Sequence, residues 1–275
     1  MTITLETILS ATRRRVAEAK KTTDLSGLAQ RAREHQPRHF GRELREASRR
    51  SVAIIAELKK ASPSRGIIRQ DFNPSLLAHH FAGAGATALS VLTDAEFFQG
   101  SLQNLHAASA ATKLPCLRKD FVVDKFQLIE SKANCADAVL LIVAALDGTE
   151  LQDLACAARE LELDVLCEVH DERELECALS VGCDIIGVNS RNLRTFQVDI
   201  EVALRLAAKI PKNVLRVAES GITSASDILS LQEEGYDAFL IGESLMKAAH
   251  PGNALRELIA AAKKSAVNAS STVRG

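Results

Sequence analysis

The chain has 275 residues, of which 47% are hydrophobic and 25% are charged, and its formal net charge is −1. This composition is typical of a globular protein with a sizeable core, and the charge balance gives no sign of a nucleic-acid or membrane-surface partner. No apolar run approaches the roughly 20 residues that span a bilayer, and the first residues lack the pattern of an export signal. Six cysteines without a CxxC pair predict reduced thiols and a cytoplasmic protein.

The first fifty residues predict helices. Leu5, Ile8 and Leu9 recur at helical spacing within residues 3–21, and Thr4 is placed to cap the helix. Two further short helical stretches follow. We interpret residues 1–50 as a helical extension that packs on the domain after it.

From residue 52 onward, short apolar runs alternate with amphipathic helical stretches, which is typical of repeated strand–helix units. We predict strands at Val52–Glu57, Ala88–Leu92, Cys116–Arg118, Ala138–Val143, Val165–Glu168, Ile185–Asn189, Leu215–Glu219 and Ala238–Ile241. The predicted helices are Ser75–Ala84, Leu102–Ala110, Lys125–Ala133, Thr149–Leu161, Glu172–Ser180, Ile200–Lys209, Ala225–Glu233 and Ala254–Lys263. Eight such units in about 200 residues match a closed (β/α)8 TIM barrel.

A doubly wound open sheet is the competing α/β fold. It normally uses fewer strands, and its dinucleotide-binding version needs a GxGxxG turn after the first strand, where this chain has SPSRG at residues 62–66. We therefore predict a catalytic (β/α)8 barrel over residues 51–264, preceded by the extension. The polar residues 265–275 are predicted to form a disordered tail.

The predicted strand ends are mostly polar. In a (β/α)8 barrel the functional groups gather at the carboxyl ends of the strands, which here carry Glu57, Lys59, Lys119, Glu168 and Glu219. Crowded opposite charges shift one another's pKa values, so that a lysine can act as an acid and a glutamate as a base near neutral pH. We interpret this cluster as catalytic, the alternative being solvated loop residues.

The last two strands end in glycines beside short helix starts, at Ser220-Gly221 and Gly242-Glu243. Backbone N–H groups at these positions form the phosphate site that is common in this fold. Glu243 is an awkward neighbour for a phosphate dianion, so we expect its carboxylate to point away from the ligand.

His170 follows Glu168 closely, but its place just before a predicted helix favours an ordinary loop position. No second histidine stands at metal-ligand spacing, so the chain is predicted to hold no metal. Neither a Walker loop nor a nucleophile elbow is present.

Six segments in order carry a family signature: residues 55–64 (IAELKKASPS), 89–94 (LSVLTD), 98–101 (FQGS), 117–121 (LRKDF), 186–193 (IGVNSRNL) and 218–222 (AESGI). Together they resemble indole-3-glycerol phosphate synthase, over the whole predicted barrel and the N-terminal extension. The resemblance implies a cofactor-free ring closure of 1-(2-carboxyphenylamino)-1-deoxyribulose 5-phosphate to indole-3-glycerol phosphate, with loss of CO2 and water, in tryptophan biosynthesis. It implies a phosphorylated small-molecule substrate and gives no indication of an obligate protein partner.

The resemblance also implies residue roles. Lys119 would be the acid that polarises the ribulose carbonyl, and Lys59 would hold the anthranilate carboxylate. Glu57 and Glu168 would take acid–base or electrostatic roles, and which carboxylate takes which proton stays open. Substrate orientation would fall on Ser62, Asn189, Arg191, Glu219 and Ser220, and phosphate binding on Ser62, Gly221, Gly242 and Glu243.

Two other functions stay open. A related barrel isomerase with a phosphoribosyl substrate would share the loops after the last two strands, but it does not explain Glu57-x-Lys59 together with Lys119-Asp120-Phe121. A non-catalytic barrel scaffold would be favoured if the strand-end charges were absent, and they are all present.

Overall fold

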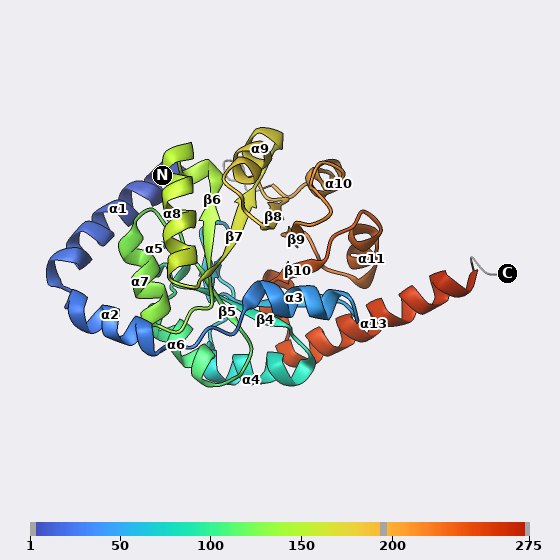
Figure 1. The fold of residues 1–275 in the computed structure, drawn as a ribbon. Helices are drawn as coiled ribbons and strands as arrows, with labels where there is room; N and C mark the ends of the chain where they lie inside the picture. Colours follow the sequence, from blue (N-terminus) through green and yellow to red (C-terminus); the bar gives the residue numbers. More distant parts are fainter. Residues whose placement is uncertain (1–3, 193–196, 273–275) are drawn as a thin grey trace.

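The computed structural model describes the backbone of residues 4–192 and 197–272, and the side chains of residues 4–192 and 197–264. In this part of the chain, eight parallel strands close into a barrel in the order β1-β10-β9-β8-β7-β6-β5-β4 (Figure 1). The strands are β1 (Ala53–Leu58), β4 (Ala88–Leu92), β5 (Cys116–Lys119), β6 (Ala138–Ile142), β7 (Asp164–Val169), β8 (Ile185–Asn189), β9 (Leu215–Glu219) and β10 (Ala238–Ile241). The predicted (β/α)8 barrel is confirmed.

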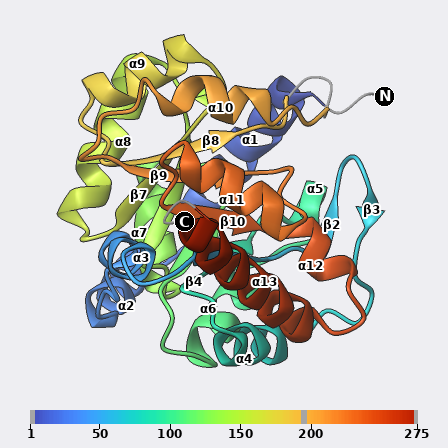
Figure 2. The same ribbon diagram turned by 90° about the vertical axis from the view of Figure 1, so that its right-hand side faces the viewer.

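Helices alternate with the strands and surround the barrel (Figure 2). They are α4 (Pro74–Ala84), α5 (Ala95–Phe98), α6 (Leu102–Ala110), α7 (Lys125–Ala133), α8 (Gly148–Glu160), α9 (Glu172–Ser180), α10 (Glu201–Ala207), α11 (Ala225–Glu233), α12 (Glu243–Lys247) and α13 (Pro251–Thr272). A 3-10 turn, Val143–Ala145, follows β6. The loop after β1 forms a small antiparallel hairpin of β2 (Ala61–Ser62) and β3 (Gly66–Ile67).

The strands alternate between two apolar layers, as β1 illustrates. Ala53 and Ile55 belong to the cluster inside the barrel, whereas Ile54 and Ala56 belong to the cluster between the strands and the helices. All of these residues are fully buried, and burying one isoleucine contributes about 2 kcal/mol. Because successive side chains point to opposite faces, Glu57 continues the inward series and enters the barrel at its carboxyl end.

The N-terminal helices cover both ends of the barrel. They are α1 (Leu5–Thr22), α2 (Leu25–Glu34) and α3 (Phe40–Ser48), and the hydroxyl of Thr4 caps α1 as predicted. Leu5 and Ile8 of α1 line the cavity at the carboxyl ends of the strands. In α3, Gly41 donates to Asp164, the first residue of β7, at 2.9 Å, and the fully buried Phe40 joins the barrel interior. The extension therefore closes the amino end and borders the carboxyl end.

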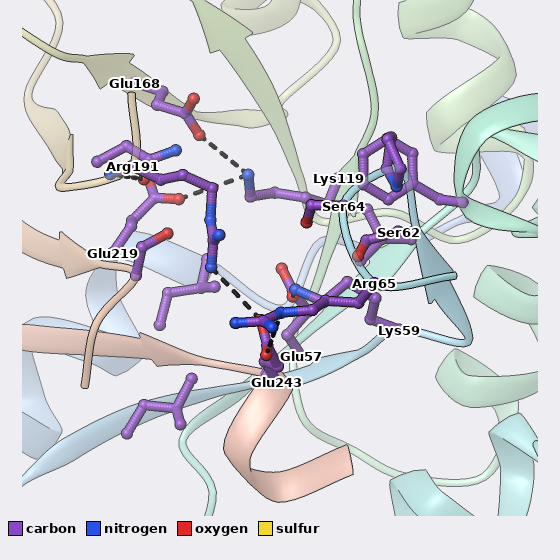
Figure 3. Close-up of a pocket in the computed structure, with 18 of the residues that line it drawn as sticks. Glu57, Lys59, Ser62, Ser64, Arg65, Lys119, Glu168, Arg191, Glu219 and Glu243 are labelled. Atoms are coloured by element: carbon purple, nitrogen blue, oxygen red, sulfur yellow. Dashed lines mark hydrogen bonds and ion pairs between the residues drawn. The ribbon is translucent and has the colours of Figure 1, made fainter. Parts of the chain in front are cut away.

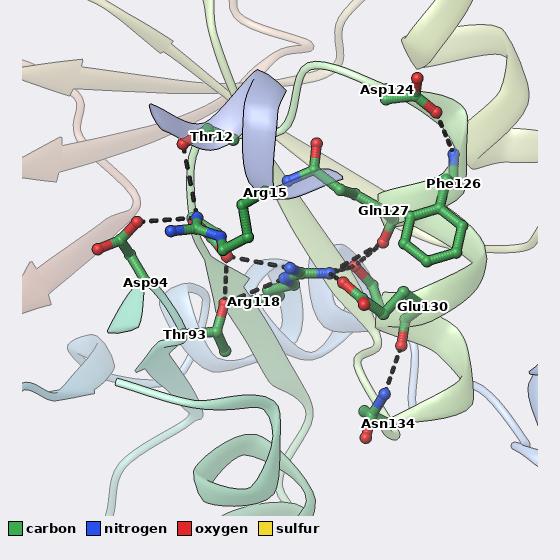
Figure 4. A network of polar contacts seen from close by, with 12 residues as sticks. Thr12, Arg15, Thr93, Asp94, Arg118, Asp124, Phe126, Gln127, Glu130 and Asn134 are labelled. Atoms are coloured by element: carbon green, nitrogen blue, oxygen red, sulfur yellow. Dashed lines mark hydrogen bonds and ion pairs between the residues drawn. The ribbon is translucent and has the colours of Figure 1, made fainter. Parts of the chain in front are cut away.

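A buried polar network joins α1 to the ends of β4 and β5 (Figure 4). The guanidinium of Arg15 lies 2.9 Å from a carboxylate oxygen of Asp94, whose side chain is 1% exposed. Arg118 donates to Thr93 and to Asp120, each at 3.0 Å, and the hydroxyl of Thr93 donates to Asp120 at 2.6 Å. The network fixes the backbone on both sides of Lys119, which lies between Arg118 and Asp120.

The predicted elements agree closely with those observed. The predicted strands coincide with β4, β8, β9 and β10, and the remaining strands differ by one residue at an end or at both ends. The β2–β3 hairpin and the short helix α5 were not predicted, because strands of two residues and a helix of four are too short for a hydrophobic period to be read from the sequence. The short helix start predicted at Gly242-Glu243 is confirmed by α12. The one predicted at Ser220-Gly221 is wrong, since the next helix, α11, begins at Ala225.

The C-terminal segment differs from the prediction. Helix α13 continues to Thr272, so the backbone of residues 265–272 is helical where a disordered tail was predicted. The alanines and lysines that lead into this segment favour the helical conformation. Residues 273–275 of the predicted tail lie outside the described residues.

Two further features of the chain bear on its surroundings. No helix in residues 4–192 and 197–272 is long and apolar enough to cross a membrane. All six cysteines carry free thiols, as predicted, and Cys116, Cys167 and Cys183 are buried. These three pack as small apolar side chains in the layer between the strands and the helices.

Candidate active site

A cavity of about 460 Å³ opens at the carboxyl ends of the barrel strands (Figure 3). Its lining includes every residue that the sequence analysis selected for a site. These are Glu57, Lys59, Ser62, Lys119, Glu168, Asn189, Arg191, Glu219, Ser220, Gly221, Gly242 and Glu243. The residues come from β1, β5, β7, β8, β9, the hairpin and the segment after β10, so the barrel brings together groups that are far apart in the sequence.

Lys119 is the central cation of the cavity. Its Nζ lies 2.9 Å from Oε2 of Glu168 and 3.4 Å from Oε2 of Glu219. Burial opposes the charge, but Glu168 and Glu219 outweigh it and raise the pKa of Lys119. Burial likewise opposes the charge of Glu168, yet Lys119 holds the pKa of Glu168 well below its usual range. At neutral pH the two side chains form a buried ion pair.

Glu219 is the carboxyl group with the opposite behaviour. Burial raises the pKa of Glu219 to about 8, because the neighbouring charge of Glu168 adds to the burial and Lys119 compensates only in part. Its Oε1 atom is buried and has no hydrogen-bond partner among the described residues. Glu168 therefore stays ionised, whereas Glu219 can exchange a proton near neutral pH.

His170 forms an ion pair with Glu168, a contact that the sequence analysis missed. Its Nε2 lies 3.3 Å from Oε1 of Glu168, and its Nδ1 lies 2.9 Å from Oε2 of Glu174. Burial opposes protonation, but both glutamates outweigh it and raise the pKa of His170 to about 10. His170 does lie in the loop before α9, as predicted. The spacing Glu168-x-His170 could have predicted this contact, because residues two apart in an extended chain point to the same side.

Two glycines make room for the carboxylates. A Cβ on Gly187 of β8 would collide with Oε1 of Glu219, and one on Gly242 would collide with the carboxylate of Glu57. The Glu57 carboxylate in turn accepts a hydrogen bond from Nζ of Lys59. Side chains at either glycine position would displace a carboxylate from the cavity.

Apolar side chains form the wall beside the charged cluster. The rings of Phe98 and Phe121 lie 6.4 Å apart between centroids and are tilted by 39°. Such a wall suits a flat aromatic ligand. None of these apolar residues was assigned to a site from the sequence, because apolar side chains are equally typical of a core. The wall consists of Leu5, Ile8, Leu92, Phe98, Phe121, Leu140, Ile142 and Leu240.

The other end of the cavity is lined by hydroxyl groups and cationic side chains. Ser62, Ser64 and Arg65 reach it from the β2–β3 hairpin (Figure 3). After β9, Ser220 and Gly221 both adopt left-handed backbone conformations, with φ of 64° and 81°. A serine in this region is strained, and strain of this kind concentrates at binding sites.

The carboxylate of Glu243 lies among three cations. It lies 3.1 Å from Nε of Arg65, 3.4 Å from Nη2 of Arg191 and 2.6 Å from Nζ of Lys247. These cations attract the carboxylate and hold it in place. The expectation that it points away from a bound phosphate stays a prediction.

The carboxylates of the cavity are engaged by protein cations. In residues 4–192 and 197–272, no three His, Cys, Asp or Glu side chains are grouped as metal ligands. Glu57 pairs with Lys59, and Glu168 pairs with Lys119. The cluster is thus arranged as ion pairs suited to proton transfer and charge stabilisation.

The fold and the cavity together define an enzyme of the (β/α)8-barrel class with its acid–base groups at the carboxyl ends of the strands. Among solved structures, thiamine phosphate pyrophosphorylase from Pyrococcus furiosus is similar, with a TM-score of 0.59. It is 15% identical, and the match covers 78% of this chain and 96% of that one, which is a likeness of fold alone.

Within that class, residues 5–258 match the family model of indole-3-glycerol phosphate synthase. The indole-3-glycerol phosphate synthase of Koribacter versatilis is 54% identical over 259 residues, covering 94% of this chain and 100% of that protein. The protein of the same name from Laribacter hongkongensis is 46% identical over 259 residues, covering 93% of this chain and 98% of that protein. The chain belongs to the indole-3-glycerol phosphate synthase family.

Proposed function

We propose that this protein forms indole-3-glycerol phosphate in the cavity described above, with Lys119 as the acid of the ring-closing step. Its family makes the protein a carboxy-lyase of tryptophan biosynthesis that acts on a phosphorylated small molecule. The observation that carries the residue assignments is the convergence of Lys119, Glu168 and Glu219 between an apolar wall and a cation-rich end. A substrate with an anthranilate ring at one end and a phosphate at the other matches this polarity.

In ring closure, Lys119 donates a proton to the carbonyl oxygen of the ribulose chain while the ring carbon that bears the carboxylate attacks the carbonyl carbon. The raised pKa of Lys119 keeps its ammonium group charged at neutral pH. The ion pair with Glu168 holds that ammonium group in place before substrate arrives. Preorganised charge of this kind stabilises the developing alkoxide without reorganisation.

Lys59 binds the anthranilate carboxylate until it leaves as CO2, which restores the aromatic ring. Its pairing with Glu57 holds it within the cavity. Dehydration then needs an acid for the departing hydroxyl and a base for the nitrogen-bound proton. Glu57, Glu168 and Lys59 are the candidates for those transfers, and the positive charge on the anilino nitrogen is stabilised by the ionised Glu168.

The phosphate lies at the opposite end, near Ser62, Gly221 and Gly242. Support for this position comes from the nearby Arg65 and Arg191, which supply positive charge from the hairpin and from the segment after β8. Asn189, Arg191, Glu219 and Ser220 line the cavity between the two ends and orient the ribulose chain.

The test is direct. Purified protein is given 1-(2-carboxyphenylamino)-1-deoxyribulose 5-phosphate, and product is followed by indole fluorescence, which the protein does not obscure because it has no tryptophan. We expect turnover by the wild type and by Lys113→Ala, a control at an exposed lysine. Lys119→Ala should lose about 10²–10⁴-fold in kcat while still binding substrate. Wild-type turnover in Lys119→Ala would contradict the assignment of the acid.

Two broader assignments belong to this proposal. A cytoplasmic location is supported by the six free thiols. Action without an obligate protein partner stays a prediction from the sequence. Size-exclusion chromatography of the active fraction tests the second assignment.

A further inference from the structure

We propose that Glu243 is an internal counter-anion that competes with the phosphate of the substrate for Arg65, Arg191 and Lys247 and so sets the affinity of the phosphate end. This inference rests on the proposed position of the phosphate. It assigns to the Glu243 side chain a role that weakens binding, where a residue beside a phosphate is ordinarily expected to strengthen it.

Glu243 and its three cations, Arg65, Arg191 and Lys247, form one cluster beside the cavity. Glu243 is the shared partner of three cations that come from separate segments: Arg65 from the β2–β3 hairpin, Arg191 after β8, and Lys247 from the end of α12. Its side chain is 21% exposed and that of Arg191 is 23% exposed. Burial opposes the charge of Glu243, but Lys247, Arg65 and Arg191 outweigh it and lower the pKa of Glu243. The carboxylate is therefore ionised at neutral pH.

The second step is the charge balance. Three cations and one carboxylate leave a net charge of +2 in the cluster formed by Arg65, Arg191, Lys247 and Glu243. A phosphate monoester carries a charge between −1.5 and −2 at pH 7. The cluster therefore matches the ligand. If Glu243 were neutral, the net charge would be +3 and the attraction for the dianion would be stronger.

The third step concerns the free enzyme. The side chain of Arg65 is 56% exposed and belongs to the loop of the hairpin, so without a partner it would sample many conformations. Its ion pair with Glu243 ties the hairpin to α12 beside the cavity (Figure 3). When phosphate binds, the cations exchange one anionic partner for another, and when product leaves, Glu243 takes them back. The Glu243 carboxylate therefore weakens the binding of phosphate and also lowers the free energy needed to release the product.

The experiment compares the wild type with Glu243→Gln, which keeps the shape and removes the charge. Binding of inorganic phosphate is measured by isothermal titration calorimetry at low ionic strength, because salt screens half-exposed charges. We expect Kd for phosphate to fall about 10-fold in Glu243→Gln, the scale of one partly screened charge. KM for the phosphorylated substrate should fall in parallel. The matched control, Glu176→Gln on the exposed face of α9, should leave both constants unchanged.

A second variant tests the cation side of the same cluster. Lys247→Gln removes a positive charge while retaining hydrogen-bonding capacity, so we expect Kd for phosphate to rise. The inference is overturned if Glu243→Gln binds phosphate with unchanged or lower affinity, or if neither protein binds phosphate. Phosphate binding is measured without turnover, so the two proposals can fail separately. If the wild type lacks synthase activity but Glu243→Gln still binds phosphate more tightly, the proposed function is refuted and this inference stands.

Discussion

Gly187 on β8 has no side chain, and the carboxyl group of Glu219, a residue of β9, fills the space beside it. The two strands are neighbours, with Gly187 paired to Val217 and Asn189 paired to Glu219. The glycine is therefore part of the site although it has no functional group. Its contribution is the space in which the carboxyl group of Glu219 lies, 3.4 Å from Nζ of Lys119.

Gly187→Ala should displace Glu219 and weaken its pairing with Lys119. We expect kcat to fall about 10- to 100-fold, because small displacements of catalytic groups are costly. Steady-state kinetics with indole fluorescence measures the effect.

The control for that variant is Gly83→Ala on α4, where an added Cβ meets nothing within 4 Å. It should retain full activity and gain up to about 1 kcal/mol of stability from helix propensity. Unchanged kcat in Gly187→Ala would contradict the spatial role of the glycine.

Glu219 should make the protein less stable as the pH rises. Its pKa is raised in the folded state to about 8 from an ordinary value of 4.5. Between these values the unfolded chain has lost the proton while the folded protein keeps it, so the free energy of unfolding falls with increasing pH and levels off above pH 8. Glu219→Gln removes this dependence.

We expect the loss of stability from pH 6 to pH 9 to be smaller in Glu219→Gln than in the wild type by about 1–3 kcal/mol. Urea unfolding at both pH values measures it, with Glu176→Gln as the control. Equal pH dependence in wild type and Glu219→Gln would show that the carboxyl group has an ordinary pKa.

His35 should stabilise the protein at lower pH. Its ring Nε2–H donates to Oδ1 of Asp137 at 2.9 Å, and the side chain is 7% exposed. Burial opposes protonation, but the hydrogen bond with Asp137 outweighs it and raises the pKa of His35 to about 9 from 6.5. The stabilisation is fully present below pH 6.5 and is lost as the pH rises through 9.

His35→Gln should therefore lower the free energy of unfolding by about 2 kcal/mol at pH 6 and by much less at pH 9.5. Guanidinium unfolding of both proteins at the two pH values measures the difference. The exposed His79 supplies a control substitution, His79→Gln, which should show no such pattern. A loss that is the same at both pH values would assign His35 a packing role only.

Arg15 should hold α1 against the barrel. It is paired with the buried Asp94 at 2.9 Å and lies 3.8 Å from Asp120. Removing one partner of such a pair leaves a buried carboxylate uncompensated, so Arg15→Ala should lose about 2–4 kcal/mol of stability. Leu5 and Ile8 of the same helix line the cavity, so KM should rise as well.

Arg14→Ala, at the exposed neighbouring position, is the control and should change neither quantity. Thermal unfolding and KM are measured together. A normal KM in a destabilised Arg15→Ala protein would show that α1 contributes to stability without shaping the cavity.

The charged part of the site was predictable because the period of a strand fixes the face to which each side chain points. Glu57 and Lys59 lie two residues apart at a strand end, and parallel strands of a barrel end at one mouth. Lys119 and Glu168 follow by the same rule. Hydrophobic periodicity also set the strand boundaries to within a residue or so at each end.

The remainder depends on contacts between segments that are far apart in the sequence. The roles of Gly187 and Gly242 arise from carboxylates on neighbouring strands, and no local pattern marks them. Leu5 and Ile8 fit an amphipathic helix equally well whether that helix packs on a barrel wall or borders a cavity. The three cations around Glu243 converge only after the barrel closes.

The cavity forms only when the barrel closes. The first and last strands are paired, with Ala53 beside Ala238 and Ala56 beside Ile241, and the cavity is lined both by α1 and by the segment after β10. Contacts between residues so far apart in the sequence carry a large loop-closure entropy, which slows their formation. A chain that lacks β10 and the segment after it therefore cannot close the barrel, and its cavity lacks Gly242 and Glu243.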